Sequence, residues 1–342
     1  MSMAIRLPAE WEEQDGILLA WPHEASDWAP LLPEVRRVYV ELINAITRFE
    51  AVLLAAPAPD EARSWLQQAG ASLERVRIIP AATDDTWTRD CGPVTVMVNN
   101  QPVLLDFGFN GWGLKFPAQH DNQLTRCLKA QAALKPRVNT IGLILEGGSI
   151  ESDGNGTILT TSQCLLSPNR NPQLDQDELT GALQSLLGAR LVHWLEHGHL
   201  AGDDTDAHID TLARLCPNDT IVYAACDTPD DEHYQPLKRM EQELGALRML
   251  TGQPYRLLPL PWPRPCHDGD GRRLPATYAN FLVINNAVLV PTYGQPTDNG
   301  ALAMVGLAFP GREIIGINCL PLLEQHGSLH CITMQLPRGV LP

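Results

Sequence analysis

The sequence predicts a mixed α/β fold, and two observations indicate this class. Apolar runs of strand length alternate with longer stretches of helical periodicity over most of the 342 residues. Six landmark residues follow one another at intervals of 53 to 70 residues: Trp21, Asp90, Glu146, His208, Tyr278 and Cys331. Such spacing is typical of a radial, propeller-like repeat in which each unit delivers a loop to one central site. A doubly wound sheet would give similar alternation and stays open as an alternative.

The first part of the chain is predicted to begin this alternation. Residues 16–22 form a predicted strand, and residues 33–50 form a predicted helix. The buried face of that helix is predicted from apolar residues at helical spacing, namely Val35, Val38, Leu42 and Ile46. A strand at 50–57, a helix near 60–69 and a strand at 75–80 follow.

The rest of the chain continues in the same way. Two strand-like runs, 94–98 and 102–109, are joined by a tight turn at Asn99-Asn100. The other predicted elements are helices near 121–132, 175–188, 232–246 and 297–308, strands just before Glu146 and at 189–195, 219–225, 255–260 and 313–317, and hairpins at 149–161 and 277–292.

Composition limits the class of protein. With 44% hydrophobic residues, the chain can bury the core of one large domain or two small ones, and no Ser/Gly-rich linker marks a boundary. The formal net charge of −15 argues against a nucleic-acid partner and against a polybasic membrane contact. It mildly favours the approach of a small cation.

The chain shows no sequence feature of export. Its N-terminal residues lack the charged and apolar regions of a signal peptide, and no apolar run has the length of a membrane span. The eight cysteines lie far apart without a CxxC pair, as expected for reduced thiols. We therefore expect a cytoplasmic protein.

The acidic segment GDDTDAHID at 202–210 is the first candidate for chemistry. If residues 206–210 are extended, Asp206, His208 and Asp210 share one face. A histidine between carboxylates is held in orientation and has its pKa raised, which suits an acid or base. The structural alternative is a solvated acidic loop in which Asp206 caps a helix that starts at His208.

A second candidate is Cys331, which follows a Gly-Ser turn at the predicted start of an apolar strand. An isolated cysteine is usually a small buried hydrophobic residue. A single thiol with a distant histidine and carboxylates is, however, the pattern of a nucleophile, and His208 could be that partner.

Two further motifs have ordinary interpretations when taken alone. In TWTRDCGP at 86–93, Arg89 and Asp90 could form a local ion pair within a turn. In EGGSIESDGNG at 146–156, Glu146 could be a solvated residue beside a Gly-rich hairpin.

A metal-dependent hydrolase is the competing interpretation. Its ligands would come from a histidine-rich stretch and the acidic segment after it: His193, His197, His199, Asp203, Asp204 and His208. No HExxH signature completes this set, so we expect no metal site.

Taken together, the motifs resemble the agmatine deiminase and bacterial peptidyl-arginine deiminase family, which has the pentein fold. The matching segments include WTRDCGP, EGGS, GDDTDAHID and GSLHC, and they run in order from residue 7 to residue 337. The resemblance implies a single catalytic domain over residues 1–342. It also implies a five-bladed α/β propeller with pseudo-fivefold symmetry and an active site on the central axis.

The same resemblance implies roles for five residues. Cys331 is the implied nucleophile, His208 the general acid and base, and Glu146 its supporting carboxylate. Asp90 and Asp210 match the pair that grips the guanidinium. Two carboxylates suit a planar cation, since each can accept paired N–H bonds.

Four more residues match positions that line the family's site. Trp87 matches a wall along the methylene chain of the substrate, and Asp204 matches an acidic residue near a distal amine. Asn280 and Gly327 match residues lining the site.

The resemblance implies deimination of a small cationic guanidine without a metal or an organic cofactor, and it suggests a homodimer. The stretch FGFNGWGLKFP at 107–117 contains no arginine to hold a substrate carboxylate, which favours agmatine and the products N-carbamoylputrescine and ammonia. The segment EQHGSLHC differs from the GGGNIHC-like run of agmatine-specific members. A peptidyl-arginine or other guanidine deiminase, and a non-catalytic polyamine-binding protein, therefore stay open.

Overall fold

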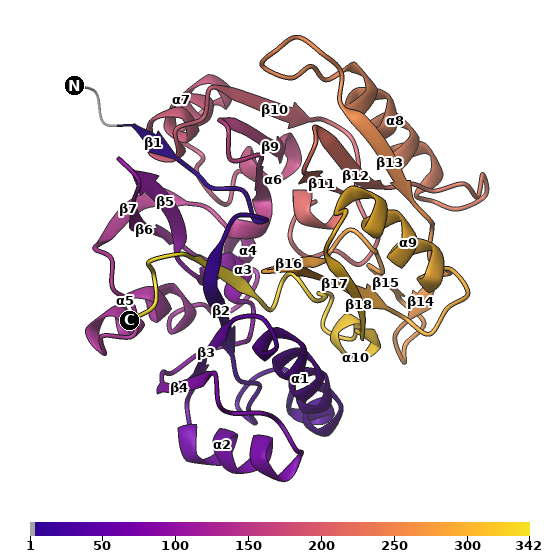
Figure 1. Ribbon diagram of the computed structural model, residues 1–342. Coiled ribbons are helices and arrows are strands. Elements are labelled where there is room, and N and C mark those ends of the chain that lie inside the picture. Colours follow the sequence, from indigo (N-terminus) through magenta and orange to yellow (C-terminus); the bar gives the residue numbers. More distant parts are fainter. Residues whose placement is uncertain (1–3) are drawn as a thin grey trace.

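The computed structural model describes residues 4–342 and has the predicted mixed α/β fold. Its strands form six small sheets of two to four strands each. Figure 1 shows the larger sheets arranged around a common centre, with the longer helices toward the outside. Because no sheet in residues 4–342 has more than four strands, the doubly wound alternative is wrong.

The first sheet joins the two ends of the chain. Its strands, in spatial order, are β19 (Met334–Pro337), β2 (Gln14–Ala20), β3 (Ala51–Ala56) and β4 (Val76–Pro80). Helices α1 (Leu32–Thr47) and α2 (Pro59–Gln68) connect the last three. The pairing of β19 with β2 is antiparallel and brings the C-terminal strand, yellow in Figure 1, against the second strand of the chain.

The second and third sheets follow in the sequence. The second contains β1 (Ile5–Arg6), β5 (Val94–Val98), β6 (Gln101–Gly108) and β7 (Val138–Ile144), with α5 (Leu124–Ala130) before β7. The third contains β10 (Leu191–Leu195), β9 (Thr157–Thr161) and β8 (Ile150–Ser152), with α6 (Ser162–Leu165) and α7 (Gln176–Leu187) before β10.

The remaining sheets complete the ring. One contains β11 (Ala213–Cys216), β12 (Thr220–Ala224) and β13 (Arg256–Leu260), with α8 (Tyr234–Ala246) before β13. Another contains β16 (Leu282–Ile284), β17 (Ala287–Thr292) and β18 (Glu313–Asn318), with α9 (Asp298–Ala308) before β18. A small hairpin consists of β14 (Cys266–His267) and β15 (Arg273–Leu274), and α10 (Leu320–Leu323) follows β18.

One pairing pattern recurs across residues 4–342. In each of the five larger sheets, an antiparallel pair shares its second strand with a parallel pair, and a helix connects the two parallel strands. A parallel pair needs such a crossover, which explains why helices and strands alternate in the sequence.

Several local predictions are confirmed. The predicted inner face of α1 is buried, since Val35, Val38, Leu42 and Ile46 are at most 4% exposed. Asn99 and Asn100 have φ values of 50° and 63° between β5 and β6, as a tight hairpin turn requires. In residues 4–342, no helix combines the length and apolarity needed to cross a bilayer.

The structure agrees with neither of the two local interpretations of residues 206–210. Residues 206–210 are not extended, because Asp206 and Ala207 have φ values of 66° and 65°. The helix predicted from His208 is only a 3₁₀ turn, η4 (Ile209–Thr211), and Asp206 does not cap it. Its carboxylate instead accepts hydrogen bonds from Lys115 and Arg170.

The predicted strand at Cys331 also begins later than expected. β19 starts at Met334, and Cys331 lies in the irregular segment before it. The backbone N–H groups of His330 and Cys331 donate to Oδ1 of Asn280 at 2.9 and 3.3 Å. These bonds replace the strand pairing that the apolar pattern predicted.

Candidate active site

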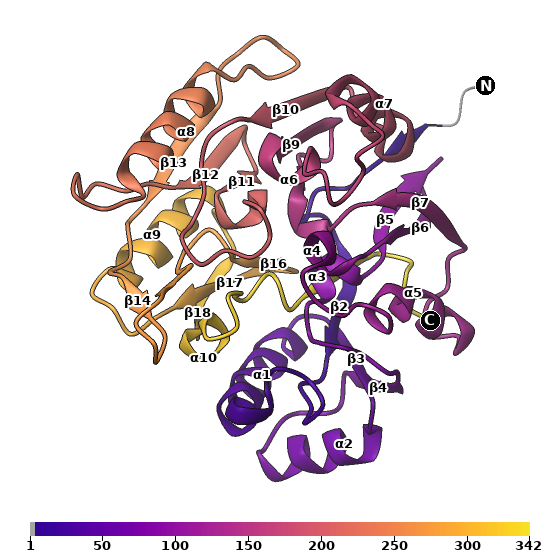
Figure 2. The same cartoon turned by 180° about the vertical axis from the view of Figure 1, so that it is seen from behind.

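The candidate residues come from loops of different sheets that meet near the centre of the ring. Asp90 lies in the short helix α3 (Thr88–Cys91), seen near the centre in Figure 2, and Glu146 precedes the 3₁₀ turn η3 (Gly147–Ser149). His208 and Asp210 lie at η4, and Cys331 precedes β19. Residues separated by up to about 240 positions are thereby brought together.

A cavity of about 160 Å³ gives access to this centre. Asp90 and Cys331 line it together with Trp87, Gly327 and Asp204. The other lining residues are mainly acidic or aromatic: Asp27, Asp85, Trp112, Phe116, Asp203, Thr205, Thr211, Gln325 and His326. An acidic and aromatic lining suits a small organic cation.

Asp90 and Asp210 both lie against Gly148. A Cβ atom added at Gly148 would lie 2.9 Å from Oδ1 of Asp90, 3.0 Å from Oδ2 of Asp210 and 2.6 Å from Nδ1 of His208. Any larger residue would therefore displace these groups. The backbone N–H of Gly148 donates to Oδ1 of Asp90 at 3.0 Å, and Nε1 of Trp112 donates to Oδ2 at 3.0 Å.

The two carboxylates differ in their electrostatics. Burial raises the pKa of Asp90 to about 6, and the nearby charges of Asp210 and Glu146 add to the effect of burial while His208 opposes it. Burial also acts to raise the pKa of Asp210, but the hydrogen bond and charge of His330 outweigh it and lower that pKa. Oδ1 of Asp210 is buried and has no hydrogen-bond partner.

His208 is fully buried between two carboxylates. Its Nδ1 lies 3.6 Å from Oδ1 of Asp90, and its Nε2 lies 3.8 Å from Oε2 of Glu146. Burial acts to lower the pKa of His208, but Asp90, Cys164 and Glu146 together raise it well above its usual value. The two carboxylates thus favour the protonated imidazole, the form that can donate a proton.

Glu146 is held by a buried arginine. Nε of Arg170 donates to both carboxylate oxygens of Glu146, at 3.0 and 2.8 Å, and both side chains are 0% exposed. Nη1 of Arg170 also donates to Oδ2 of Asp206 at 2.7 Å. Burial acts to raise the pKa of Glu146, but His208 and Arg170 outweigh it and lower that pKa.

The thiol of Cys331 lies against Asn280. The distance from Sγ to Oδ1 of Asn280 is 3.3 Å, and the cysteine is 5% exposed. Burial, with the negative charges of Asp210 and Asp90, raises the pKa of the thiol well above its usual value. A cation bound between these carboxylates would reduce that effect, since opposite charge favours the thiolate.

Trp87 and Gly327 face each other at the side of the cavity. A Cβ atom added at Gly327 would lie 2.1 Å from the indole ring of Trp87, so only glycine allows this approach. The indole nitrogen donates to Asp85 at 3.0 Å, which fixes the ring.

Asp204 lies at the mouth of the cavity. Its side chain is 43% exposed, and Oδ2 is 4.0 Å from Nδ1 of His326. Nζ of Lys115 donates to the backbone oxygen of Asp204 and pairs with Asp206. The structure thus brings Asp90, Glu146, His208, Asp210, Asn280 and Cys331 together and leaves Asp204 farther out.

The local ion pair between Arg89 and Asp90, the ordinary interpretation of this motif, does not form. The guanidinium of Arg89 donates to Gln335 and, at 3.5 Å, to the backbone oxygen of His330. It points away from Asp90, which leaves that carboxylate without an arginine partner in the described part of the chain.

The histidines of the competing metal interpretation do not gather at one place. His197 pairs with Glu243, His193 lies 3.4 Å from the hydroxyl of Tyr255, and His199 packs near His233. Within residues 4–342, two other groups have metal-ligand geometry: Glu146 with Cys164 and His208, and Glu10 with Glu151 and His330. In each group an arginine already forms an ion pair with one of the carboxylates, and its positive charge opposes the binding of a metal cation.

Sequence reasoning missed four residues of the site. Arg170, Cys164, Trp112 and His330 each contact a candidate residue. His330 is adjacent to Cys331, and Arg170 lies in the polar segment SPNRNP, so both had a weak signal. Trp112 lies in the stretch FGFNGWGLKFP that bears on substrate choice, whereas no local feature distinguishes Cys164 from a core residue.

Known proteins match this chain along its length. The family model described as Porphyromonas-type peptidyl-arginine deiminase matches residues 6–337. An agmatine deiminase of Pseudomonas aeruginosa is 32% identical over 97% of this chain and 95% of its own. A solved structure named provisionally as a peptidyl-arginine deiminase is 46% identical, with a TM-score of 0.95 over 99% of this chain and 100% of its own.

A further solved structure contains a substrate. It is a Cys-to-Ser variant of the C. jejuni agmatine deiminase with substrate bound, and it is 38% identical to this chain. The TM-score is 0.93, over 100% of this chain and 98% of that chain.

Proposed function

The chain belongs to the Porphyromonas-type peptidyl-arginine deiminase family, and on this premise we propose that it hydrolyses the guanidinium group of agmatine. As a member of this family it is a hydrolase that acts on the C–N bonds of linear amidines. The proposed products are N-carbamoylputrescine and ammonia.

One observation supports the proposal above the others. Two buried carboxylates, Asp90 and Asp210, lie against Gly148 beside His208, and their negative charges act on the thiol of Cys331. Neither carboxylate is paired with an arginine or lysine within hydrogen-bonding distance among the described residues. A guanidinium placed between them would add a positive charge beside both carboxylates and would supply N–H donors, including one for the unpartnered Oδ1 of Asp210.

In the proposed mechanism, the Cys331 thiolate attacks the central guanidinium carbon and forms a C–S bond. His208 gives its proton to an amino group of the tetrahedral adduct, the C–N bond breaks, and ammonia leaves. The neutral His208 then takes a proton from a water molecule, whose oxygen attacks the S-alkylthiouronium carbon. Cleavage of the C–S bond releases the ureido product and regenerates the cysteine.

The surrounding residues would support each step. Glu146, held by Arg170, stabilises the protonated form of His208. Asn280 holds the segment that carries Cys331. Trp87 would contact the methylene chain of the substrate, and Gly327 leaves room for the indole ring.

We also propose that the ring of sheets is a five-bladed α/β propeller formed by one catalytic domain over residues 1–342. The recurring strand order and the pairing of β19 with β2 support this architecture. Closure of the first sheet by the last strand would fix the position of Cys331 relative to Asp90.

The choice of agmatine rests on the mouth of the cavity. Asp27, Asp85 and Asp204 line it, and the stretch near Trp112 that faces it contains no arginine to bind a carboxylate. A peptidyl-arginine substrate is the second candidate. The 46% identity to a structure named provisionally for that activity favours it.

A substrate panel tests the proposal. The purified protein is incubated with agmatine, free arginine and benzoyl-arginine amide, with and without a chelator, and ureido product is measured by colorimetry. We expect product from agmatine and no effect of the chelator. Product from benzoyl-arginine amide alone would favour the second candidate. Loss of activity with the chelator would indicate a metal-dependent hydrolase, and binding of agmatine without product would indicate a polyamine-binding protein.

The acid limb of the pH profile should report Asp90. Since the raised pKa of Asp90 is about 6, lowering the pH through this value protonates the carboxylate and weakens its grip on the cation. We expect kcat/KM to fall about tenfold for each pH unit below that point. The fall of kcat itself should begin at a lower pH, because the bound cation stabilises the ionised carboxylate of Asp90. A kcat/KM that stays constant well below this pKa would contradict the role of Asp90.

Replacing Asp204 with asparagine should weaken agmatine binding selectively. Because the side chain is 43% exposed, solvent screens its attraction for the distal amine. We expect KM for agmatine to rise about two- to fivefold with little change in kcat. The control is an alkylguanidine of equal length without the amine, whose KM should not change. An unchanged KM for agmatine would remove Asp204 from the amine-binding site.

A further inference from the structure

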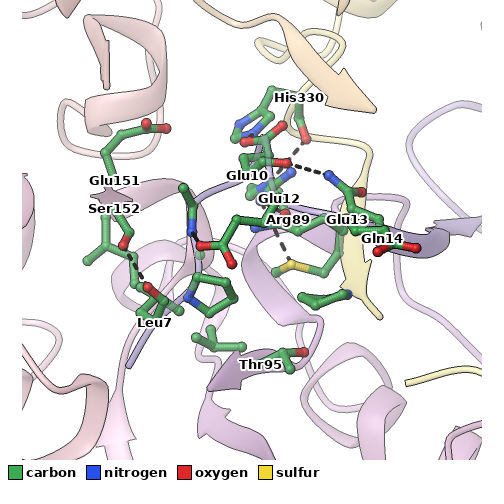
Figure 3. A pocket seen from close by; sticks show the side chains of 18 residues that line it. Leu7, Glu10, Glu12, Glu13, Gln14, Arg89, Thr95, Glu151, Ser152 and His330 are labelled. Atoms are coloured by element: carbon green, nitrogen blue, oxygen red, sulfur yellow. Dashed lines mark hydrogen bonds and ion pairs between the residues drawn. The ribbon is translucent and has the colours of Figure 1, made fainter. Parts of the chain in front are cut away.

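A second cavity of about 50 Å³ lies behind the site and is shown in Figure 3. Arg89, Gly147 and His330 line this rear cavity. Their neighbours in the sequence belong to the front: Asp90 and Cys331 line the larger cavity, and Gly148 lies against Asp90 and Asp210. Consecutive residues therefore line different cavities at two places, Arg89-Asp90 and His330-Cys331.

The imidazole of His330 connects Asp210, a residue of the candidate site, with Glu10, a residue that lines the rear cavity. Its Nδ1 lies 2.7 Å from Oδ2 of Asp210, and its Nε2 lies 2.8 Å from Oε2 of Glu10. The side chain is 2% exposed. Figure 3 shows His330 beside Glu10 at the rear cavity. Since a carboxylate only accepts hydrogen bonds, Nδ1 donates to Asp210.

Glu10 is itself held firmly. Nη2 of Arg214 donates to Oε2 of Glu10 at 2.7 Å, and the backbone N–H of Val283 donates to Oε1 at 2.8 Å. Nη2 of Arg214 also lies 3.0 Å from Nε2 of His330. Burial acts to raise the pKa of Glu10, but His330 and Arg214 outweigh it and hold that pKa well below its usual range.

The bond from His330 fixes the orientation of the Asp210 carboxylate. One of its oxygens is bound to His330, whereas Oδ1 is buried without a partner. The backbone of His330 is fixed as well, through the bond from its N–H to Asn280. The imidazole thus ties the orientation of the carboxylate to the segment that carries Cys331.

We propose that His330, anchored by Glu10, is a positioning residue that turns Oδ1 of Asp210 toward the guanidinium of the substrate. This inference rests on the proposed function, which supplies the cation that Oδ1 binds. His330 touches neither the substrate nor the reacting atoms in this scheme and acts through Asp210.

Loss of the imidazole would change the titration of Asp210. The groups facing Asp210 are His330, His208, Arg214, Arg89, Asp90 and Cys331. Of these, His330 donates directly to the carboxylate. Without that donor the pKa of Asp210 rises, so the carboxylate takes up a proton at higher pH. As this pKa approaches the value of about 6 for Asp90, which sets the limb in the wild type, both carboxylates protonate over the same range, and the acid limb of kcat/KM should become steeper and move to higher pH.

Two replacements of His330 separate the two hydrogen bonds. An asparagine amide can occupy the place of Nδ1 and donate to Asp210, whereas a glutamine amide reaches the place of Nε2 beside Glu10. We expect His330→Gln to lower kcat/KM about 10- to 100-fold, mainly through KM, with the acid limb moved to higher pH. His330→Asn should retain more of the activity and show a smaller move of the limb, because it keeps a donor to Asp210 but loses the charge of the imidazole and its bond to Glu10.

A third variant tests the inference in case the His330 variants do not fold. Glu10→Gln keeps the acceptor for Val283 but removes the charge behind His330, and we expect a smaller move of the limb in the same direction. Thermal unfolding of each variant identifies loss of fold. Equal activity and equal pH profiles in folded His330→Gln and His330→Asn, or an unmoved limb in Glu10→Gln when those do not fold, would overturn the inference. If the proposed function is wrong, the wild-type protein itself shows no turnover. In that case this inference, which depends on the proposed function, is wrong as well.

Discussion

Replacing Cys331 with serine should abolish turnover while the protein still binds agmatine. A serine hydroxyl does not ionise near neutral pH, so the neighbouring cation cannot convert it to a strong nucleophile. We expect kcat to fall by at least about 10⁴-fold, as when other enzymes lose their nucleophile. Steady-state ureido formation measures the loss, and calorimetry with agmatine measures binding.

The matched control is Cys127→Ser. Cys127 is partly buried on α5, outside the site, and its replacement should leave kcat within about twofold of the wild type because surface changes of this kind have small effects. The Cys-to-Ser variant of the C. jejuni relative holds bound substrate, which supports the expectation for binding. Substantial turnover by Cys331→Ser would exclude Cys331 as the nucleophile.

Replacing Asp90 with asparagine should give the second large loss. The carboxylate is 4% exposed, and its partners are the neutral N–H groups of Trp112 and Gly148. The amide carries no charge for the guanidinium and no longer favours the protonated His208, which lies 3.6 Å away. We expect kcat/KM to fall about 100- to 1000-fold, the usual effect of removing one partner of a buried charge pair.

The control for Asp90→Asn is Asp177→Asn. Asp177 is exposed in the first turn of α7, so its replacement removes the same charge far from the cavity and should leave kcat/KM unchanged. Circular dichroism and thermal unfolding establish that the Asp90 variant is folded. A folded Asp90→Asn protein with nearly wild-type kcat/KM would show that one carboxylate suffices to bind the cation.

The secondary structure was predictable where the local pattern and the tertiary environment agree. The apolar face of α1 is buried as its spacing predicted, and the Asn99-Asn100 turn has the left-handed conformation expected of asparagine. The predictions failed at residues 206–210 and at Cys331. At both places a side chain distant in the sequence, Arg170 or Asn280, binds the backbone segment or its carboxylate and overrides local preference.

The candidate site was predictable in its motifs but not in its connections. Asp90, His208, Asp210 and Cys331 each stood in a recognisable segment, and the structure brings the segments together. Nothing in the local pattern indicated that Arg89 would turn away from Asp90, or that Arg170 would bind Glu146. Those contacts depend on which loops become neighbours when the ring of sheets closes.

The sequence by itself determined the mixed α/β class, the alternation of helices and strands, and the residue types available for chemistry. Hydrophobic periodicity and short motifs are local properties, and neighbouring residues suffice to express them. Only the tertiary structure decided that His330 joins Asp210 to Glu10, which lie 120 and 320 positions away in the chain. The reason is physical: the orientation and pKa of a buried carboxylate depend on the charges and donors within a few ångströms, and those neighbours come from the packing of distant segments.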